Sequence, residues 1–142
     1  MSQKPEPRTI QLDPACTGYR RILGGPPETV TMRSGYVVLQ PGSNVGRHST
    51  ESFEEMLVIL DGEGEMILGD GTLLTLQPYA IAYCPPATDH DVRSTGSGPL
   101  SLHFTFHPSD FLRGALAGSP GSCTWRMGSC CLGGWPELHR PH

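Results

Sequence analysis

Hydrophobic and polar residues alternate along most of this chain in short segments, which are separated by turns rich in glycine and proline. Residues 90–94 alternate cleanly, and residues 100–106 repeat the pattern with four apolar residues toward a core and His103 on the opposite face. Residues 55–60 are apolar on both faces after the first residue, which predicts a strand covered on each side. Short strands at this spacing, without a long helix, predict an all-β antiparallel sandwich or barrel.

Two Asp-Gly pairs, at residues 61–62 and residues 70–71, are typical two-residue hairpin turns. The strand that precedes the first pair would return along residues 63–68, and the second pair would lead into residues 72–76. The sequence therefore predicts two consecutive hairpins in the middle of the chain.

Composition divides the chain into four parts. Residues 1–17 are polar, contain three prolines and predict an N-terminal arm, whereas the predicted strands occupy residues 18–108. Residues 109–118 predict a short helix or turn that Ser109 would cap. Residues 119–142 are rich in Gly, Ser, Pro, Cys and Trp without any period, which predicts a disordered tail.

Length and charge restrict the class of protein. A chain of 142 residues indicates one domain, and a net charge of −4 provides no basic surface for nucleic acid or anionic membranes. No run is long enough to span a membrane, and residues 1–7 lack the apolar core of a signal peptide. The five cysteines are odd in number, so we expect reduced thiols in a cytoplasmic protein, with Cys84 as a small buried residue.

The residues that carry chemistry lie in two segments. Residues 41–62 contain His48, a hydroxyl residue and a carboxylate pair ahead of a predicted strand, and His90 begins another strand after Pro85-Pro86. Two imidazoles and a carboxylate from separate strands suit a divalent transition metal.

These two segments resemble the two motifs of the cupin superfamily. The first motif, usually written G-x5-H-x-H-x(3,4)-E-x6-G, is matched by Gly42, His48, Glu55 and Gly62. The second motif, usually written G-x5-P-x-G-x2-H-x3-N, is matched by Pro85 and His90. The motifs and the strands between them cover roughly residues 35 to 106. The resemblance implies a cupin-type double-stranded β-helix, that is, a jelly-roll barrel.

The sequence departs from these motifs at four positions. Thr50 stands where the first motif has its second histidine, and Ser94 replaces the asparagine of the second motif. Tyr79 and Ala87 stand where glycines are usual. Glycine there serves chiefly for tight turning, so we expect a modest change of the backbone to absorb both substitutions.

The resemblance implies His48, Glu55 and His90 as the ligands of one divalent transition metal per chain: Fe, Mn, Ni or Zn. Two histidines and one carboxylate are also the composition of open-sided non-haem iron sites. Strand alternation places Thr50 on the face of His48, so Thr50 is an accessory candidate, as is Glu51 if its loop bends inward. Loss of one ligand would alternatively leave the barrel without metal.

Two functions remain open at this point. The resemblance implies a metal-binding cupin that acts on a small polar molecule, such as an organic acid or a sugar, as a dioxygenase, an isomerase or epimerase, or a decarboxylase. The alternative is a non-catalytic barrel that binds a small ligand with weak or no metal. Members of this superfamily are often dimers. A homodimer would cover residues 56–60, although an internal second sheet explains their apolar character equally well.

Overall fold

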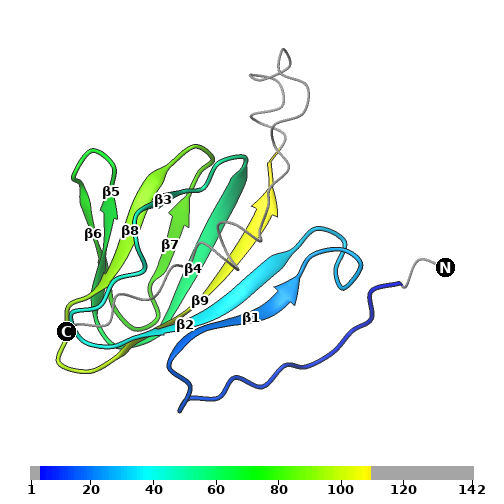
Figure 1. Cartoon of the computed structure of the whole chain (residues 1–142), viewed down its shortest axis with the longest axis horizontal. Helices are drawn as coiled ribbons and strands as arrows, with labels where there is room; N and C mark the ends of the chain where they lie inside the picture. The colour runs from blue at the N-terminus through cyan, green and yellow to red at the C-terminus, as the bar shows by residue number, and fades with distance from the viewer. Residues whose placement is uncertain (1–3, 110–142) are drawn as a thin grey trace.

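The computed structural model describes residues 4–109, which form nine strands in two antiparallel sheets (Figure 1). The five-stranded sheet has the order β1 (Gly18–Gly24), β2 (Arg33–Leu39), β9 (Leu100–Pro108), β4 (Phe53–Asp61) and β7 (Ile81–Cys84). The four-stranded sheet has the order β3 (His48–Ser49), β8 (Asp89–Ser94), β5 (Gly64–Leu68) and β6 (Leu73–Leu76). The predicted all-β jelly-roll class is confirmed.

The predictions for the chain ends meet the structure only in part. Residues 4–17 contain no strand and precede β1, which begins at Gly18. The predicted helix or turn over 109–118 lies outside the described residues except for Ser109, and so does the whole predicted tail over 119–142. Among residues 4–109 no helix is long and apolar enough to cross a membrane.

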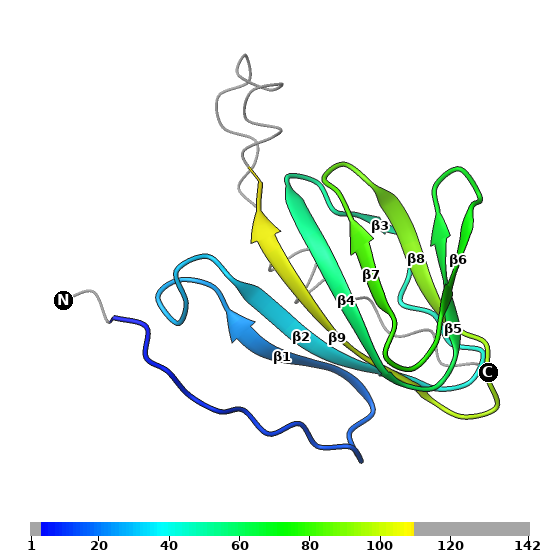
Figure 2. The same cartoon turned by 180° about the vertical axis from the view of Figure 1, so that it is seen from behind.

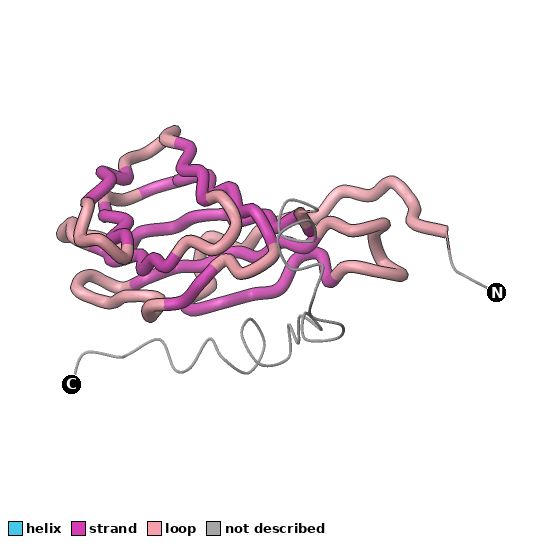
Figure 3. Tube along the Cα trace, turned by 90° about the horizontal axis from the view of Figure 1, so that it is seen from above, coloured by secondary structure: helices cyan, strands magenta, loops and turns pink. Residues whose placement is uncertain are grey.

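The core lies between the two sheets, which face each other in the view from above (Figure 3). Strand β9 shows how alternation builds this core: its four apolar residues of even number are almost fully buried, whereas His103 is half-buried on the outer face. The predicted orientation of this strand is therefore confirmed. The other core residues are Val37, Leu39, Val45, Phe53, Leu57, Ile59, Met66, Leu76, Ala82, Cys84 and Val92.

One of the two predicted hairpins is wrong. The turn at residues 70–71 joins β5 to β6, which pair as an antiparallel hairpin. The turn at residues 61–62 instead carries the chain from the five-stranded sheet to the four-stranded sheet, and β4 pairs with β7 and β9. Gly62 has φ 85°, and a side chain there would meet the carbonyl oxygen of Pro99, so this turn packs against the start of β9. The turn is tight, but its strands belong to different sheets.

The prediction that β4 is covered on both faces is also wrong for the described part of the chain. The inner face of β4 packs against the second sheet, but Met56 and Leu60 on the outer face are each 42% exposed. Strand β7 lies beside β4 (Figure 2), and its residues Ile81 and Tyr83 are exposed as well. The apolar residues on both faces of β4 reflect an inner core and an uncovered outer face, and the homodimer remains a prediction.

We expected the backbone to change at Tyr79 and Ala87, the two positions where the motif usually has glycine. The structure does not show this change. Tyr79 has φ 68° and Ala87 has φ 57°, so both residues adopt the left-handed conformation that favours glycine. At Tyr79 the amide of Ala80 donates to the carbonyl of Gln77 over 2.9 Å, and Pro78 precedes Tyr79, as in a type II turn. The backbone was kept and the side chains bear the strain, which costs on the order of 1–2 kcal/mol per residue.

Replacing Tyr79 by glycine should therefore stabilise the protein. Tyr79 is 93% exposed, so the change removes strain without loss of packing. After the entropy of the more flexible unfolded chain is deducted, we expect the free energy of unfolding to rise by about 0.5–1 kcal/mol. Urea denaturation measures the change.

Tyr79→Ala is the matched control, since it removes the same side chain but keeps the Cβ atom that causes the strain. We expect no gain in stability from it. Equal effects of the two substitutions would show that the strain at residue 79 is negligible.

Candidate metal centre

The two predicted histidine ligands meet because β3 and β8 pair as neighbours. In the register of this ladder His48 lies directly opposite His90, and the centroids of their rings are 4.3 Å apart. Glu55 approaches from β4 in the other sheet, and its Oε2 atom lies 3.1 Å from Nε2 of His90. The site therefore bridges the two sheets inside the barrel.

Glu55 is buried in apolar surroundings. On one side its partner in the ladder is Phe106 of β9, and on the other side it is Cys84 of β7. Both neighbours are buried, and Glu55 itself is only 3% exposed. A carboxylate in such surroundings requires a charged or hydrogen-bonding partner, because its desolvation is costly.

The ligand atoms of His48, Glu55 and His90 all lie within 4.8 Å of one another. Nε2 of His90 and Oε2 of Glu55 are buried, and neither makes a hydrogen bond of acceptable geometry with any group in the described part of the chain. Leaving such atoms unsatisfied costs about 1–3 kcal/mol each. Two imidazole nitrogens and a carboxylate oxygen that converge in this way fit a divalent transition metal.

The outer nitrogen of each imidazole is held by a backbone carbonyl. Nδ1 of His48 lies 2.7 Å from the carbonyl oxygen of Gly46, and Nδ1 of His90 lies 3.1 Å from that of Thr88. A carbonyl oxygen only accepts hydrogen bonds, so Nδ1 of each ring carries the proton. In the neutral ring Nε2 then presents its lone pair toward the cluster, as a metal ligand must.

Asp91 fixes the loop that carries His48, a role that the sequence did not reveal. Its Oδ1 accepts the amide N–H of Gly46 over 2.8 Å, and its Oδ2 accepts the side-chain amide of Asn44 over 2.8 Å. The alternation of β8 predicts that Asp91 faces away from His90. No spacing in the sequence indicates that the loop before β3 passes on that side.

The two accessory candidates are placed differently from the three main ones. Thr50 is fully buried, but its hydroxyl donates to the carbonyl of Pro85 over 2.6 Å and accepts the amide N–H of Thr88 over 3.0 Å. Glu51 is exposed and does not join the three-residue cluster. The described residues thus bring together His48, Glu55 and His90.

A thiol lies beside the cluster in the interior of the barrel. Cys84 is buried, as predicted, and its Sγ lies 3.3 Å from Sδ of Met66. Burial, with a further contribution from the negative charge of Glu55, raises the pKa of Cys84 to about 12. The thiol is therefore neutral and belongs to the packed core.

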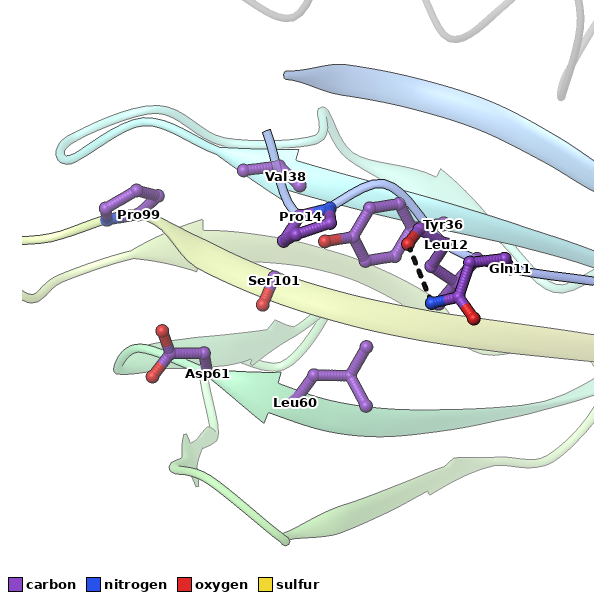
Figure 4. Close-up of a pocket in the computed structure, with 9 residues that line it drawn as sticks. All are labelled: Gln11, Leu12, Pro14, Tyr36, Val38, Leu60, Asp61, Pro99 and Ser101. Atoms are coloured by element: carbon purple, nitrogen blue, oxygen red, sulfur yellow. Dashed lines mark hydrogen bonds between the residues drawn. The ribbon is translucent and has the colours of Figure 1, made fainter. Parts of the chain in front are cut away.

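A pocket lies outside the barrel, between the N-terminal arm and the outer face of the five-stranded sheet (Figure 4). It encloses about 370 Å³ and is lined by Gln11, Leu12, Pro14, Tyr36, Val38, Leu60, Asp61, Pro99 and Ser101. None of the three clustered ligands contributes to it. Asp61 is the one carboxylate among its described lining residues, whereas the cluster of groups that could hold a metal lies, in the described part of the chain, inside the barrel.

The surroundings of the two histidines shift their pKa values in opposite directions. Burial and the neighbouring His90 lower the pKa of His48, and weaker contributions from Gly46 and Glu55 do not reverse this. Burial also acts to lower the pKa of His90, but the carboxylate of Glu55, 3.1 Å from Nε2, and the carbonyl of Thr88 outweigh it and raise the pKa.

The pKa of His90 should therefore depend on Glu55. In metal-free protein we expect His90 to titrate above the ordinary histidine value and His48 below it. Glu55→Gln removes the negative charge while burial remains, so the pKa of His90 should fall below that value. NMR titration of the imidazole signals measures both pKa values.

His103 provides an internal control for this titration. Its pKa is lowered by burial on the outer face of β9, and Glu55 makes no contribution to it. The Glu55→Gln substitution should leave the His103 titration in place. An unchanged pKa of His90 in this variant would show that the two side chains are not coupled.

The comparisons with known proteins agree with this geometry. The family model described as a cupin domain matches residues 35–106, about half of the chain. A cupin 2 conserved barrel domain protein from Salinispora arenicola superposes with a TM-score of 0.62 at 17% identity, with 80% of this chain and 99% of that chain covered. A search of curated protein sequences gives no significant match.

Two further solved structures are 25% identical to this chain. The cupin domain of an XRE family transcriptional regulator from Enterobacter cloacae has a TM-score of 0.54, with 63% of this chain and 93% of that chain covered. An oxalate decarboxylase has a TM-score of 0.51, with 56% of this chain and 22% of that chain covered. With the family match, the two-sheet barrel and the His-Glu-His cluster at its interior, the chain belongs to the cupin superfamily.

Proposed function

We propose that this cupin holds one divalent transition metal through His48, Glu55 and His90 and acts on a small polar molecule such as an organic acid or a sugar. The observation that carries the proposal is the convergence of three buried ligand atoms within 4.8 Å. Structural ion pairs do not need a second imidazole at the same point. Here Nδ1 of each ring is held by a backbone carbonyl, and a hydrogen bond of this kind on the other ring nitrogen is usual for metal-ligating histidines.

The number of ligands favours an open site. Three protein ligands leave coordination positions that a substrate or water can fill, as in catalytic sites of Fe, Mn, Ni or Zn proteins. A bound metal would supply Lewis-acid polarisation of a carbonyl or an enediolate, or a redox centre for dioxygen chemistry. The reaction classes that such a metal would serve are those of a dioxygenase, an isomerase or epimerase, or a decarboxylase.

The chain's own residues would prepare this site in three ways. The carbonyls of Gly46 and Thr88 hold the proton of each imidazole on Nδ1 and keep Nε2 free of it. Glu55 provides a negative charge that offsets part of the charge of the metal. Phe53 and Phe106, whose ring centroids are 6.5 Å apart, lie beside Glu55 and would keep water away from it. A dry site strengthens each of these electrostatic interactions.

The similar structures support two versions of this function. Oxalate is a small organic acid, so the likeness to an oxalate decarboxylase supports catalysis on such a molecule. The likeness to the cupin domain of a transcriptional regulator supports the alternative, in which the barrel binds a small ligand without catalysis. Metal content separates the two versions.

Protein purified without a histidine tag should contain one transition metal per chain by elemental analysis. The His48→Ala, His90→Ala double variant should lose it. Glu55→Gln should weaken Zn²⁺ binding by more than the roughly 10–100-fold that loss of an outer-shell partner costs, because a direct ligand is removed. Isothermal titration calorimetry with Zn²⁺ measures the affinity.

Glu54→Gln is the matched control for the Glu55 substitution. Glu54 is the adjacent carboxylate on the same strand, and it accepts a hydrogen bond from the hydroxyl of Tyr83 on the outer face. We expect its Zn²⁺ affinity to equal that of the wild type. Wild-type protein that stays metal-free and still binds oxalate would contradict the catalytic proposal and favour the binding module.

A further inference from the structure

Thr50 occupies the position at which the first cupin motif usually has its second histidine, yet its hydroxyl is engaged elsewhere. The hydroxyl donates to the carbonyl of Pro85 over 2.6 Å. It also accepts the amide N–H of Thr88 over 3.0 Å. The hydroxyl proton of Thr50 is therefore bonded to the loop between β7 and β8. The same loop contains Thr88, whose carbonyl holds the His90 ring.

The backbone of Thr50 holds the same residue from its other side. The amide N–H of Thr50 donates to the carbonyl of Thr88 over 3.1 Å, so both backbone groups of Thr88 are bonded to Thr50. That carbonyl of Thr88 also accepts the proton on Nδ1 of His90, again over 3.1 Å. The backbone amide of Thr50 and the His90 ring thus share one carbonyl oxygen, while the hydroxyl of Thr50 holds the peptide on the other side of Thr88.

The loop needs such an anchor because its backbone is strained. Ala87, directly before Thr88, has φ 57°, a conformation that is unfavourable for any residue with a Cβ atom. Its amide N–H donates to the carbonyl of Glu51 over 2.8 Å, and Glu51 itself has φ 54°. Without the hydroxyl of Thr50, the peptide between Ala87 and Thr88 would be able to turn and relieve this strain.

We propose that Thr50 is a positioning residue for His90 and not a metal ligand. Its hydroxyl fixes Pro85 and the N–H of Thr88, and so keeps Thr88 in the place where its carbonyl, bonded to the Thr50 amide, holds the His90 ring with its proton on Nδ1 and with Nε2 directed at Glu55 and His48. The link to metal affinity rests on the proposed metal site, whereas the effect on the imidazole ring is a property of the metal-free protein. Substitution of the motif histidine has thus replaced a ligand by an anchor for another ligand.

The arrangement at His48 supplies an internal reference. His48 is held by the carbonyl of Gly46, and Gly46 is fixed by Asp91, without any contribution from Thr50. A substitution at Thr50 should therefore disturb one imidazole and leave the other in place. A merely structural role of Thr50 would affect both rings or neither.

The test compares Thr50→Val, which keeps the shape but removes the hydroxyl, with Thr50→Ser, which keeps the hydroxyl. In metal-free protein at a pH above the pKa values of both histidines, ¹⁵N NMR distinguishes the protonated ring nitrogen from the unprotonated one. We expect both rings of the wild type and of the Ser variant in the Nδ1–H form. In the Val variant the His90 ring should exchange between its two neutral tautomers, so the chemical shifts of its two nitrogens should converge. The nitrogen shifts of His48 should stay unchanged.

Zn²⁺ titration is the second measurement. Thr50→Val should weaken Zn²⁺ binding by roughly 10–100-fold, the range for loss of an outer-shell partner, and Thr50→Ser should retain the wild-type affinity. If Thr50→Val alone does not fold, its combination with Tyr79→Gly serves in its place, because that substitution is expected to stabilise the protein and leaves the strained loop between β7 and β8 unchanged.

The result that would overturn the proposal is a Val variant in which His90 keeps its Nδ1–H form, or in which both rings change equally. Retained Zn²⁺ affinity in a Val variant whose His90 ring has changed would also overturn it. A wild-type protein that binds no Zn²⁺, but whose His90 ring responds to Thr50→Val, would contradict the metal site and leave the positioning of His90 established. The failures of the two proposals are therefore distinguishable.

Discussion

A buried carboxylate is the constraint around which this barrel is arranged. Glu55 lies between two sheets with Phe106 and Cys84 as its neighbours in the ladder, where an unpaired negative charge would cost several kcal/mol. Its partner, His90, comes from the opposite sheet, and the two side chains approach to 3.1 Å. The site therefore depends on both sheets, because each supplies one partner of the buried pair.

Two of the three non-glycine residues with positive φ in the described part of the chain lie beside this site. Glu51 and Ala87, both with positive φ, lie in the two loops beside the histidines, and the amide of Ala87 bonds to the carbonyl of Glu51. Non-glycine residues persist in such conformations only where their surroundings determine them strongly. The hydroxyl of Thr50 belongs to those surroundings. Thr50, which replaces the second histidine of the first motif, is thereby linked to Ala87, which replaces a glycine of the second motif.

The outer surface of the five-stranded sheet differs from the interior of the barrel in the side chains that it presents. The interior of the barrel is filled by packed side chains and one polar cluster, whereas Met56 and Leu60 leave apolar surface on the outer face of β4. Toward β1 the same face is covered by the arm, which lines a pocket with Tyr36 and Val38. Within residues 4–109, the cluster of His and carboxylate groups that could hold a metal lies inside the barrel and not on this outer face.

The sequence by itself determined that the chain is built of short strands and which residues of β8 and β9 face the interior, and the motif resemblance identified the three clustered residues, because alternation and motif spacing are local properties of the chain. Only the tertiary structure decided that β3 pairs with β8 so that His48 lies opposite His90. It also decided that the turn at residues 61–62 changes sheets. Pairing across a long stretch of chain depends on how the whole core closes, and no local pattern encodes it. For the same reason the sequence placed Thr50 near the site but could not show that its hydroxyl is bound to the loop that orients His90.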